Sequence, residues 1–146
     1  MINKVSLGVL LLIFPVLINI EKFSYITLSS KDLTCLAKNI YYEARGESKQ
    51  GQIAVGLVTL NRVNHVSFPN SVCAVVNQKN QFSWVSQQVP LINKAEWSNS
   101  LDAAYKAVLG NHNLGSFKAL YFHSTEVDPD WGKKPVKTIG RHVFYE

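Results

Sequence analysis

Two helical patterns separated by a very short connection constrain this chain more than any other feature of its sequence. Apolar residues recur at helical spacing on one face of residues 31–45 and again on one face of residues 50–63. Asp32 near the start of the first pattern and Gly46 after its end are typical of helix ends. Because only residues 46–49 separate the patterns, the sequence predicts an antiparallel αα-hairpin.

The rest of the chain predicts two more helices and then a small sheet. Phe68-Pro69-Asn70 should open a short third helix, since proline suits the first helical position. An apolar stripe over residues 98–109, stopped by Gly110, predicts a fourth helix. Alternating patterns predict three strands, at 119–123, 136–139 and 142–145. We therefore expect one α+β domain, mostly helical, with a small C-terminal antiparallel β element.

The first thirty residues differ in composition from the remainder. Lys4 precedes an uncharged apolar run at residues 5–20, which is shorter than the roughly 20 residues of a spanning helix and is interrupted by Pro15. A buried core helix is the alternative, but the run has no polar face. We therefore expect residues 1–30 to be a signal peptide or an N-terminal membrane anchor, which engages the membrane or the secretion machinery. Residues 31–146 would then form an exported domain in the periplasm or cell envelope, released or anchored in the inner membrane.

Charge and motif content argue against several classes of function. The chain has 15 Lys and Arg against 10 Asp and Glu, but the basic residues are scattered and form no stripe, so we expect no nucleic-acid partner. The four histidines lack metal-binding spacings, and Cys-x-x-Cys, phosphate-loop and Gly-x-Ser-x-Gly motifs are absent. We therefore expect no metal and no cofactor, although a zinc site assembled from distant residues stays open.

Cys35 and Cys73 both belong to the expected exported domain. An oxidising compartment permits a disulfide between them, which would close a loop of roughly forty residues and contribute about 3–4 kcal/mol. Two buried free thiols are the alternative.

Two glutamates, Glu43 and Glu47, lie four residues apart near the end of the first predicted helix. Glu43 follows two tyrosines at the edge of the apolar face. A carboxyl group in a partly dry place has its pKa raised from about 4.3 towards 6 or 7, where it can act as a general acid. The alternative is a solvated helix end, with either glutamate paired to Arg45 or Lys49.

Several short motifs follow one another in a fixed order between residues 33 and 145. They are Tyr42-Glu43-Ala44-Arg45-Gly46-Glu47, Gly51-Gln52-Ile53-Ala54-Val55, Leu60-Asn61-Arg62-Val63, Phe68-Pro69, Gln81-Phe82-Ser83-Trp84, Ala119-Leu120-Tyr121-Phe122-His123 and Ile139-Gly140-Arg141-His142-Val143-Phe144-Tyr145. In this order they resemble the SleB-type cell wall hydrolases, a family of peptidoglycan-cleaving domains.

The resemblance implies a fold similar to lytic transglycosylases and lysozyme, with a helical body and a small β element beside a groove. It implies cleavage of the β-1,4 bond between N-acetylmuramic acid and N-acetylglucosamine in peptidoglycan glycan strands. The family's acid is the first glutamate of its Glu-Ala-Arg-Gly-Glu motif, which is Glu43 here. A lytic transglycosylase uses the muramic acid's own 6-hydroxyl as nucleophile, so one carboxyl can carry both proton transfers without a cofactor. Two alternatives stay open: a zinc-dependent N-acetylmuramoyl-L-alanine amidase, and a non-catalytic, membrane-tethered wall-binding module.

Other motif residues are candidate substrate-binding residues. Glu47 would orient the site from the turn, and Asn61 would tie that turn to the second helix unless it is an interior structural amide. The aromatic rings of Gln81-Phe82-Ser83-Trp84 would stack on sugars and its amide would bind acetamido groups, with Phe82 as core the alternative. The terminal strands would line the groove opposite Glu43 through Tyr121, His123, His142 and Tyr145. Trp131 would be a groove lip or a hydrophobic anchor.

Overall fold

The computed structural model describes residues 28–87, 90–91 and 93–146, and the apolar run at residues 5–20 lies outside them. Within the described part, no helix is long and apolar enough to cross a membrane. The predicted α+β class is confirmed. The elements are α1 (Ser30–Ala44), α2 (Lys49–Val63), α3 (Val72–Val76), α4 (Ser83–Gln87), α5 (Lys94–Val108), β1 (Tyr121–Ser124), β2 (Pro135–Ile139) and β3 (His142–Tyr145).

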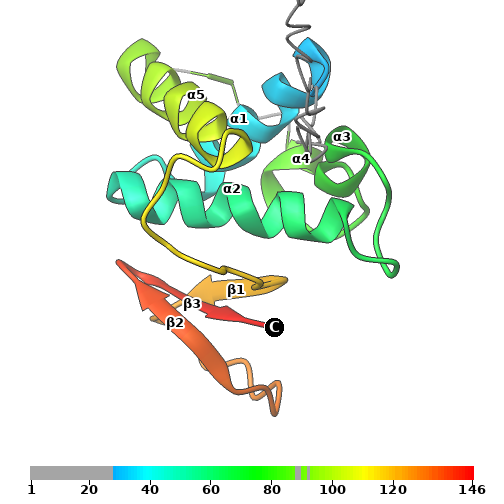
Figure 1. Ribbon diagram of the computed structural model, residues 1–146, viewed down its shortest axis with the longest axis vertical. Helices are drawn as coiled ribbons and strands as arrows, with labels where there is room; N and C mark the ends of the chain where they lie inside the picture. The colour runs from blue at the N-terminus through cyan, green and yellow to red at the C-terminus, as the bar shows by residue number, and fades with distance from the viewer. Residues whose placement is uncertain (1–27, 88–89, 92) are drawn as a thin grey trace, which may run out of the picture.

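Helix α2 lies between two layers, as Figure 1 shows. Helices α1, α3 and α5 pack against it on one side, and the sheet lies on the other. Every residue from 51 to 60 is consequently buried. The sequence predicted only one apolar side for this helix, because its second buried side is built from small residues, which give a weak helical pattern.

The α1–α2 hairpin predicted from the short connection is present. Each of its helices begins at a serine cap: Ser29 accepts a hydrogen bond from the Asp32 backbone N–H, and Ser48 accepts one from that of Gly51. At Gly56, an added Cβ would lie 3.0 Å from Cδ1 of Ile40 and 3.4 Å from Cβ of Ala107. Glycine at this position lets α1 and α5 pack closely on α2.

Two helices begin at other residues than predicted, and one helix was not predicted. Helix α3 begins at Val72, where the Ser71 side chain accepts from the Ala74 backbone N–H, so Pro69 does not open it. Helix α5 begins at Lys94 and not at residue 98, because the Asn93 side chain accepts hydrogen bonds from the backbone N–H groups of Ala95 and Glu96 and so caps the helix. Helix α4, which was not predicted, arises within the polar-aromatic run after Gln81.

The sheet has the strand order β1–β3–β2, with both neighbouring pairs antiparallel. Phe144 of β3 is fully buried on the face that packs against the helices. Its cluster also contains Ala44, Ala54, Val55, Val58 and Ala119. Because side chains alternate along a strand, Tyr145 and its partner Tyr121 occupy the opposite, outer face.

A disulfide joins Cys35 of α1 to Cys73 of α3, so the structure contains the bridge and not two free thiols. The backbone N–H of Cys73 also donates to Oδ1 of Asp32, at 2.9 Å. The disulfide and this hydrogen bond both attach the short helix α3 to the first turns of α1.

We predict that replacing both cysteines, Cys35→Ala with Cys73→Ala, lowers the free energy of unfolding by about 3–4 kcal/mol, because the bridge restricts the unfolded chain. Urea unfolding followed by circular dichroism measures the change. A reducing agent should destabilise the natural chain by a similar amount and leave the double variant unchanged. An equal effect of reduction on both proteins would contradict the prediction.

Candidate active site

The Glu43 side chain lies in the last turn of α1 and is half-buried. It forms no ion pair with the other residues that the structure describes. Burial raises the pKa of its carboxyl from 4.5 to about 6. The Trp84 side chain faces this carboxyl and offsets part of the rise in pKa, although its buried indole N–H does not reach full hydrogen-bond geometry with any described group.

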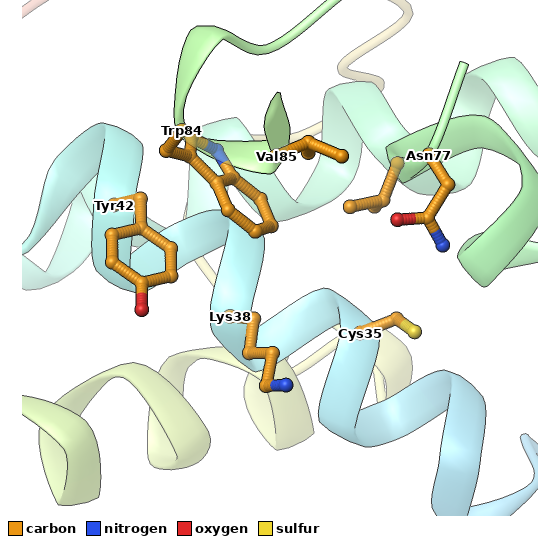
Figure 2. Close-up of a pocket in the computed structure, with 7 residues that line it drawn as sticks. Cys35, Lys38, Tyr42, Asn77, Trp84 and Val85 are labelled. Atoms are coloured by element: carbon orange, nitrogen blue, oxygen red, sulfur yellow. The ribbon is translucent and has the colours of Figure 1, made fainter. Parts of the chain in front are cut away.

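A stacked aromatic pair stands next to Glu43. The rings of Tyr42 and Trp84 lie 4.5 Å apart between centroids, at an interplanar angle of 24°. Figure 2 shows these two rings, from α1 and α4, beside a hollow of about 390 Å³ that Lys38 and Cys35 also line. Glu43 is not itself among the residues lining that hollow.

The other members of the polar-aromatic run have different surroundings. Phe82 is only 8% exposed and stacks on Trp84, with ring centroids 6.4 Å apart. It is therefore a core residue, which was the alternative to a sugar-binding role. Ser83 is exposed at the start of α4, and Gln81 lines a second hollow. Within this run, Phe82 therefore supports the Trp84 ring, whereas Gln81 and Ser83 present exposed polar groups.

Glu47 is paired, but not to a neighbour on its own hairpin. Its carboxylate accepts hydrogen bonds from the backbone N–H of Arg141 at 3.1 Å and from Arg141 Nε at 2.8 Å, and the side chain is 5% exposed. Burial alone would raise the pKa of Glu47, but these bonds and the Arg141 charge lower it below its usual value. A Cβ at Gly140, where φ is +57°, would overlap with the Glu47 carboxylate.

The pairing expected for a solvated helix end is absent from the described residues. Arg45 instead pairs with Glu96 at 3.7 Å, and Lys49 pairs with Asp102 at 2.9 Å. Glu47 thus joins the α1–α2 turn to the β2–β3 turn, and Glu43 is left as the unpaired member of the two.

Asn61 does not tie the glutamate turn to α2, contrary to that expectation. Its Nδ2 donates to the backbone carbonyls of Phe117, at 2.9 Å, and Ala119, at 3.0 Å, so it holds the segment that enters β1. Gln52 holds the glutamate turn instead, because its Nε2 donates to the carbonyls of Arg45 and Glu47. Sequence reasoning missed Gln52, although a buried polar residue directly after a tight turn is a signal for such a role.

The four aromatic and histidine candidates of the terminal strands do not line one groove. His142 is 8% exposed on the helix-facing side of the sheet, where its ring lies 5.2 Å from that of Phe122, and burial lowers its pKa. Tyr121, His123 and Tyr145 lie on the outer face. There His123 Nε2 shares a 2.7 Å hydrogen bond with the Tyr145 hydroxyl.

A second hollow, of about 470 Å³, lies between the end of α2 and the sheet. It is lined by Arg62, Gln81, Tyr121, Phe122, Trp131 and Lys133. Sequence reasoning missed Arg62 and Lys133 as site residues. The available signal was the charge of Arg62 at the end of a helix whose other residues are largely apolar.

No group of three or more His, Cys, Asp or Glu side chains in the described ranges is arranged to hold a metal ion. The site contains one half-buried carboxyl, whose pKa is raised to about 6, beside the stacked rings of Tyr42 and Trp84.

Comparison with known proteins gives consistent matches. A profile of the family described as Cell Wall Hydrolase matches residues 46–145. The chain is 35% identical over 121 residues to the spore cortex-lytic enzyme of Bacillus subtilis (strain 168), which covers 81% of this chain and 38% of that protein. It is 34% identical over 122 residues to the spore cortex-lytic enzyme of Oceanobacillus iheyensis, which covers 80% of this chain and 42% of that protein. The chain thus spans about two fifths of the length of these relatives.

Two solved structures have similar folds. The catalytic domain of the Bacillus cereus SleB protein aligns with a TM-score of 0.65 and 31% identity, covering 82% of this chain and 92% of that domain. The catalytic domain of the germination-specific lytic transglycosylase SleB from Bacillus anthracis aligns with a TM-score of 0.66 and 32% identity, covering 83% and 98%.

We predict opposite effects of two amide substitutions on stability. The raised pKa of Glu43 means that native stability falls as pH rises from 4.5 to 6, by about 2 kcal/mol in total. Glu43→Gln should therefore gain about 2 kcal/mol relative to the natural chain between pH 4 and pH 7. Glu47→Gln should lose about 1–3 kcal/mol at pH 7, because charged hydrogen bonds to Arg141 are removed.

Urea unfolding of both variants, from pH 7 to well below pH 4, measures these changes. The Glu47→Gln loss should shrink as pH falls through the lowered pKa of Glu47, since the natural chain then loses the same charge. A pH-independent difference for Glu43→Gln would show that its carboxyl has an ordinary pKa in the folded state.

Proposed function

The chain belongs to the cell wall hydrolase family, and we propose that it is a peptidoglycan-cleaving enzyme that acts as a lytic transglycosylase. The bond cleaved is the β-1,4 linkage between N-acetylmuramic acid and N-acetylglucosamine. The observation that carries the proposal is the half-buried Glu43 carboxyl. Because its pKa is about 6, both its neutral and its charged form are populated near neutral pH, as an acid that later acts as a base requires.

Glu43 carries both proton transfers in this proposal. In its neutral form, the carboxyl donates its proton to the glycosidic oxygen while the bond from that oxygen to C1 of the muramic acid breaks. The resulting carboxylate then removes the proton of the 6-hydroxyl, whose oxygen forms the new bond to C1. The products are a 1,6-anhydro end and a free 4-hydroxyl, and Glu43 is neutral again.

A second reacting carboxylate is not required for this route, whereas an ordinary glycosidase uses two. This agrees with the surroundings of Glu47, whose carboxylate is occupied by Arg141. We assign Glu47 a positioning role, in which it holds the β2–β3 turn beside the end of α1. Gln52 and Asn61 would also have positioning roles, because they donate hydrogen bonds to backbone carbonyls. Gln52 holds the glutamate turn, and Asn61 holds the segment that enters β1.

Substrate contacts follow from the chemistry of the neighbouring groups. Tyr42 and Trp84 are only partly buried, and the accessible parts of this stacked pair can contact a sugar ring, because aromatic rings are flat and apolar. Exposed Ser83 and Gln81 can exchange hydrogen bonds with hydroxyl and acetamido groups.

We also propose export to the periplasm or cell envelope, where peptidoglycan lies. The apolar run at residues 5–20, preceded by Lys4, is the feature that supports a signal or an anchor. Any truncation should retain Ser29, since its side chain caps α1.

We expect Glu43→Gln to abolish cleavage of purified peptidoglycan while the fold is retained. Loss of turbidity in a suspension of cell walls measures activity, and circular dichroism measures folding. Glu126→Gln, in the exposed loop after β1, is the matched control and should retain full activity. Cleavage by a folded Glu43→Gln protein at the natural rate would refute the assignment.

Mass spectrometry of the released fragments tests the reaction type. Anhydro ends are expected from a lytic transglycosylase. Reducing ends would indicate hydrolysis, free stem peptides would indicate an amidase, and binding without fragments would indicate a non-catalytic wall-binding module.

The pH dependence of kcat/KM should report the acid. Activity should fall above pH 6, because Glu43 must be protonated to act. Trp84→Phe keeps an aromatic face but removes the group that lowers the pKa of Glu43, so the alkaline limb should move to higher pH. An unchanged limb in the Trp84→Phe protein would exclude this influence of Trp84.

A further inference from the structure

Arg62 is a buried cation that lacks an anionic partner. Its side chain is 6% exposed, yet it forms no ion pair with any carboxylate in the described ranges. Buried charges are normally paired, because their removal from water is costly. Here the guanidinium is held by neutral groups: Nε donates to the Leu120 carbonyl at 2.6 Å, and Nη1 donates to Gln81 Oε1 at 3.0 Å.

The same guanidinium is fixed by aromatic rings and reaches the second hollow. Its central carbon lies 5.2 Å from the ring centroid of Phe68 and 5.6 Å from that of Tyr121. Nη2 makes no hydrogen bond to the residues that the structure describes, and Arg62 lines the hollow. A rigidly held donor with unused hydrogens therefore faces a space large enough for a ligand.

A second cation, Lys133, also lines this hollow. Its Nζ lies 4.5 Å from the ring centroid of Tyr121 and donates to the backbone carbonyl of Glu146 at 3.2 Å. The acidic residues of the same loop, Glu126, Asp128 and Asp130, form no ion pair with it in the described structure. Two cations thus line one hollow, and no Asp or Glu side chain in the described ranges forms an ion pair with either of them.

The neutral groups around the hollow suit an N-acetylated sugar. Since an arginine can only donate, the bond from Arg62 requires Gln81 to present its oxygen there, which leaves the Gln81 amide nitrogen as a free donor. Trp131 is 45% exposed, and its ring packs edge-on against His123 at 5.3 Å and Tyr145 at 5.6 Å. It therefore offers a supported aromatic face.

We propose that this hollow binds the carboxylate-bearing lactyl arm of a muramic acid residue, with the carboxylate between Arg62 and Lys133. The carboxylate belongs either to the arm itself or to the peptide attached to it. Gln81 donates to the acetamido carbonyl of the same sugar, and Trp131 contacts its ring. The inference rests on the proposed function only for the identity of the ligand.

The segment from Gln81 to Trp84 links the hollow to Glu43, and we infer that both belong to one glycan-binding surface. Gln81 lines the hollow, and Trp84, three residues further along the chain, faces the Glu43 carboxyl. Three residues span at most about 11 Å between Cα atoms. The site would therefore hold a sugar close to the scissile bond and select for muramic acid over N-acetylglucosamine.

Binding is tested with the full chain carrying Glu43→Gln, so that cleavage does not interfere. N-acetylmuramic acid, muramyl dipeptide and N-acetylglucosamine are titrated separately, and NMR follows the Trp131 indole N–H and the Gln81 side-chain amide. We expect N-acetylmuramic acid or the dipeptide to bind at least five-fold more tightly than N-acetylglucosamine. Tighter binding of the free sugar identifies the lactyl carboxylate, and tighter binding of the dipeptide identifies the peptide carboxylate.

Two variants in the same background locate the interaction. Lys133→Gln should remove most of the preference for the carboxylate-bearing ligands, whereas Lys134→Gln, an exposed neighbour outside the hollow, should keep it. Equal binding of all three ligands, or no shift at Trp131 and Gln81, would overturn the inference. Failure of the proposed function is recognised separately, as absence of cleavage by the natural chain while the Glu43→Gln protein still prefers muramic acid.

Discussion

The burial of α2 on two sides is the constraint on which the rest of this structure depends. One side packs against α1, α3 and α5, and the other carries the sheet through Phe144 and its small neighbours. Polar side chains near both ends of α2 also form hydrogen bonds to the neighbouring segments. Gln52 holds the glutamate turn, and Asn61 and Arg62 hold the segment that enters β1. A single helix therefore sets the position of both parts of the candidate site.

Two glutamates one helical turn apart have opposite electrostatic environments for a simple reason. Glu47 lies where the β2–β3 turn can donate to it, so its charge is stabilised and its pKa falls. Glu43 is half-buried, and the Trp84 side chain offsets only part of the resulting rise in pKa, so the neutral form of the carboxyl is favoured. The contrast separates a positioning group from a group that can exchange a proton.

The distribution of cations extends this reasoning beyond the proton transfer. The scattered positive charge of the chain argued against a nucleic-acid partner but indicated no particular binding residue, because charges far apart in sequence form no local pattern. The fold brings Arg62 and Lys133 to one hollow together with Gln81 and Trp131. A polymer that alternates neutral and carboxylate-bearing sugars has the chemistry to match such a surface.

The sequence by itself determined the α+β class, the hairpin of α1 and α2 and the three strands, because helical spacing and short turns are local signals. Its resemblance to a known family pointed to Glu43 as the candidate acid. Only the tertiary structure decided that Glu47 pairs with Arg141, that Asn61 serves the sheet, that His142 faces the helices and that Arg62 lines a hollow. Each of these depends on strand register or on contacts between residues distant in the chain, and a one-residue change of register reverses the face on which a side chain lies.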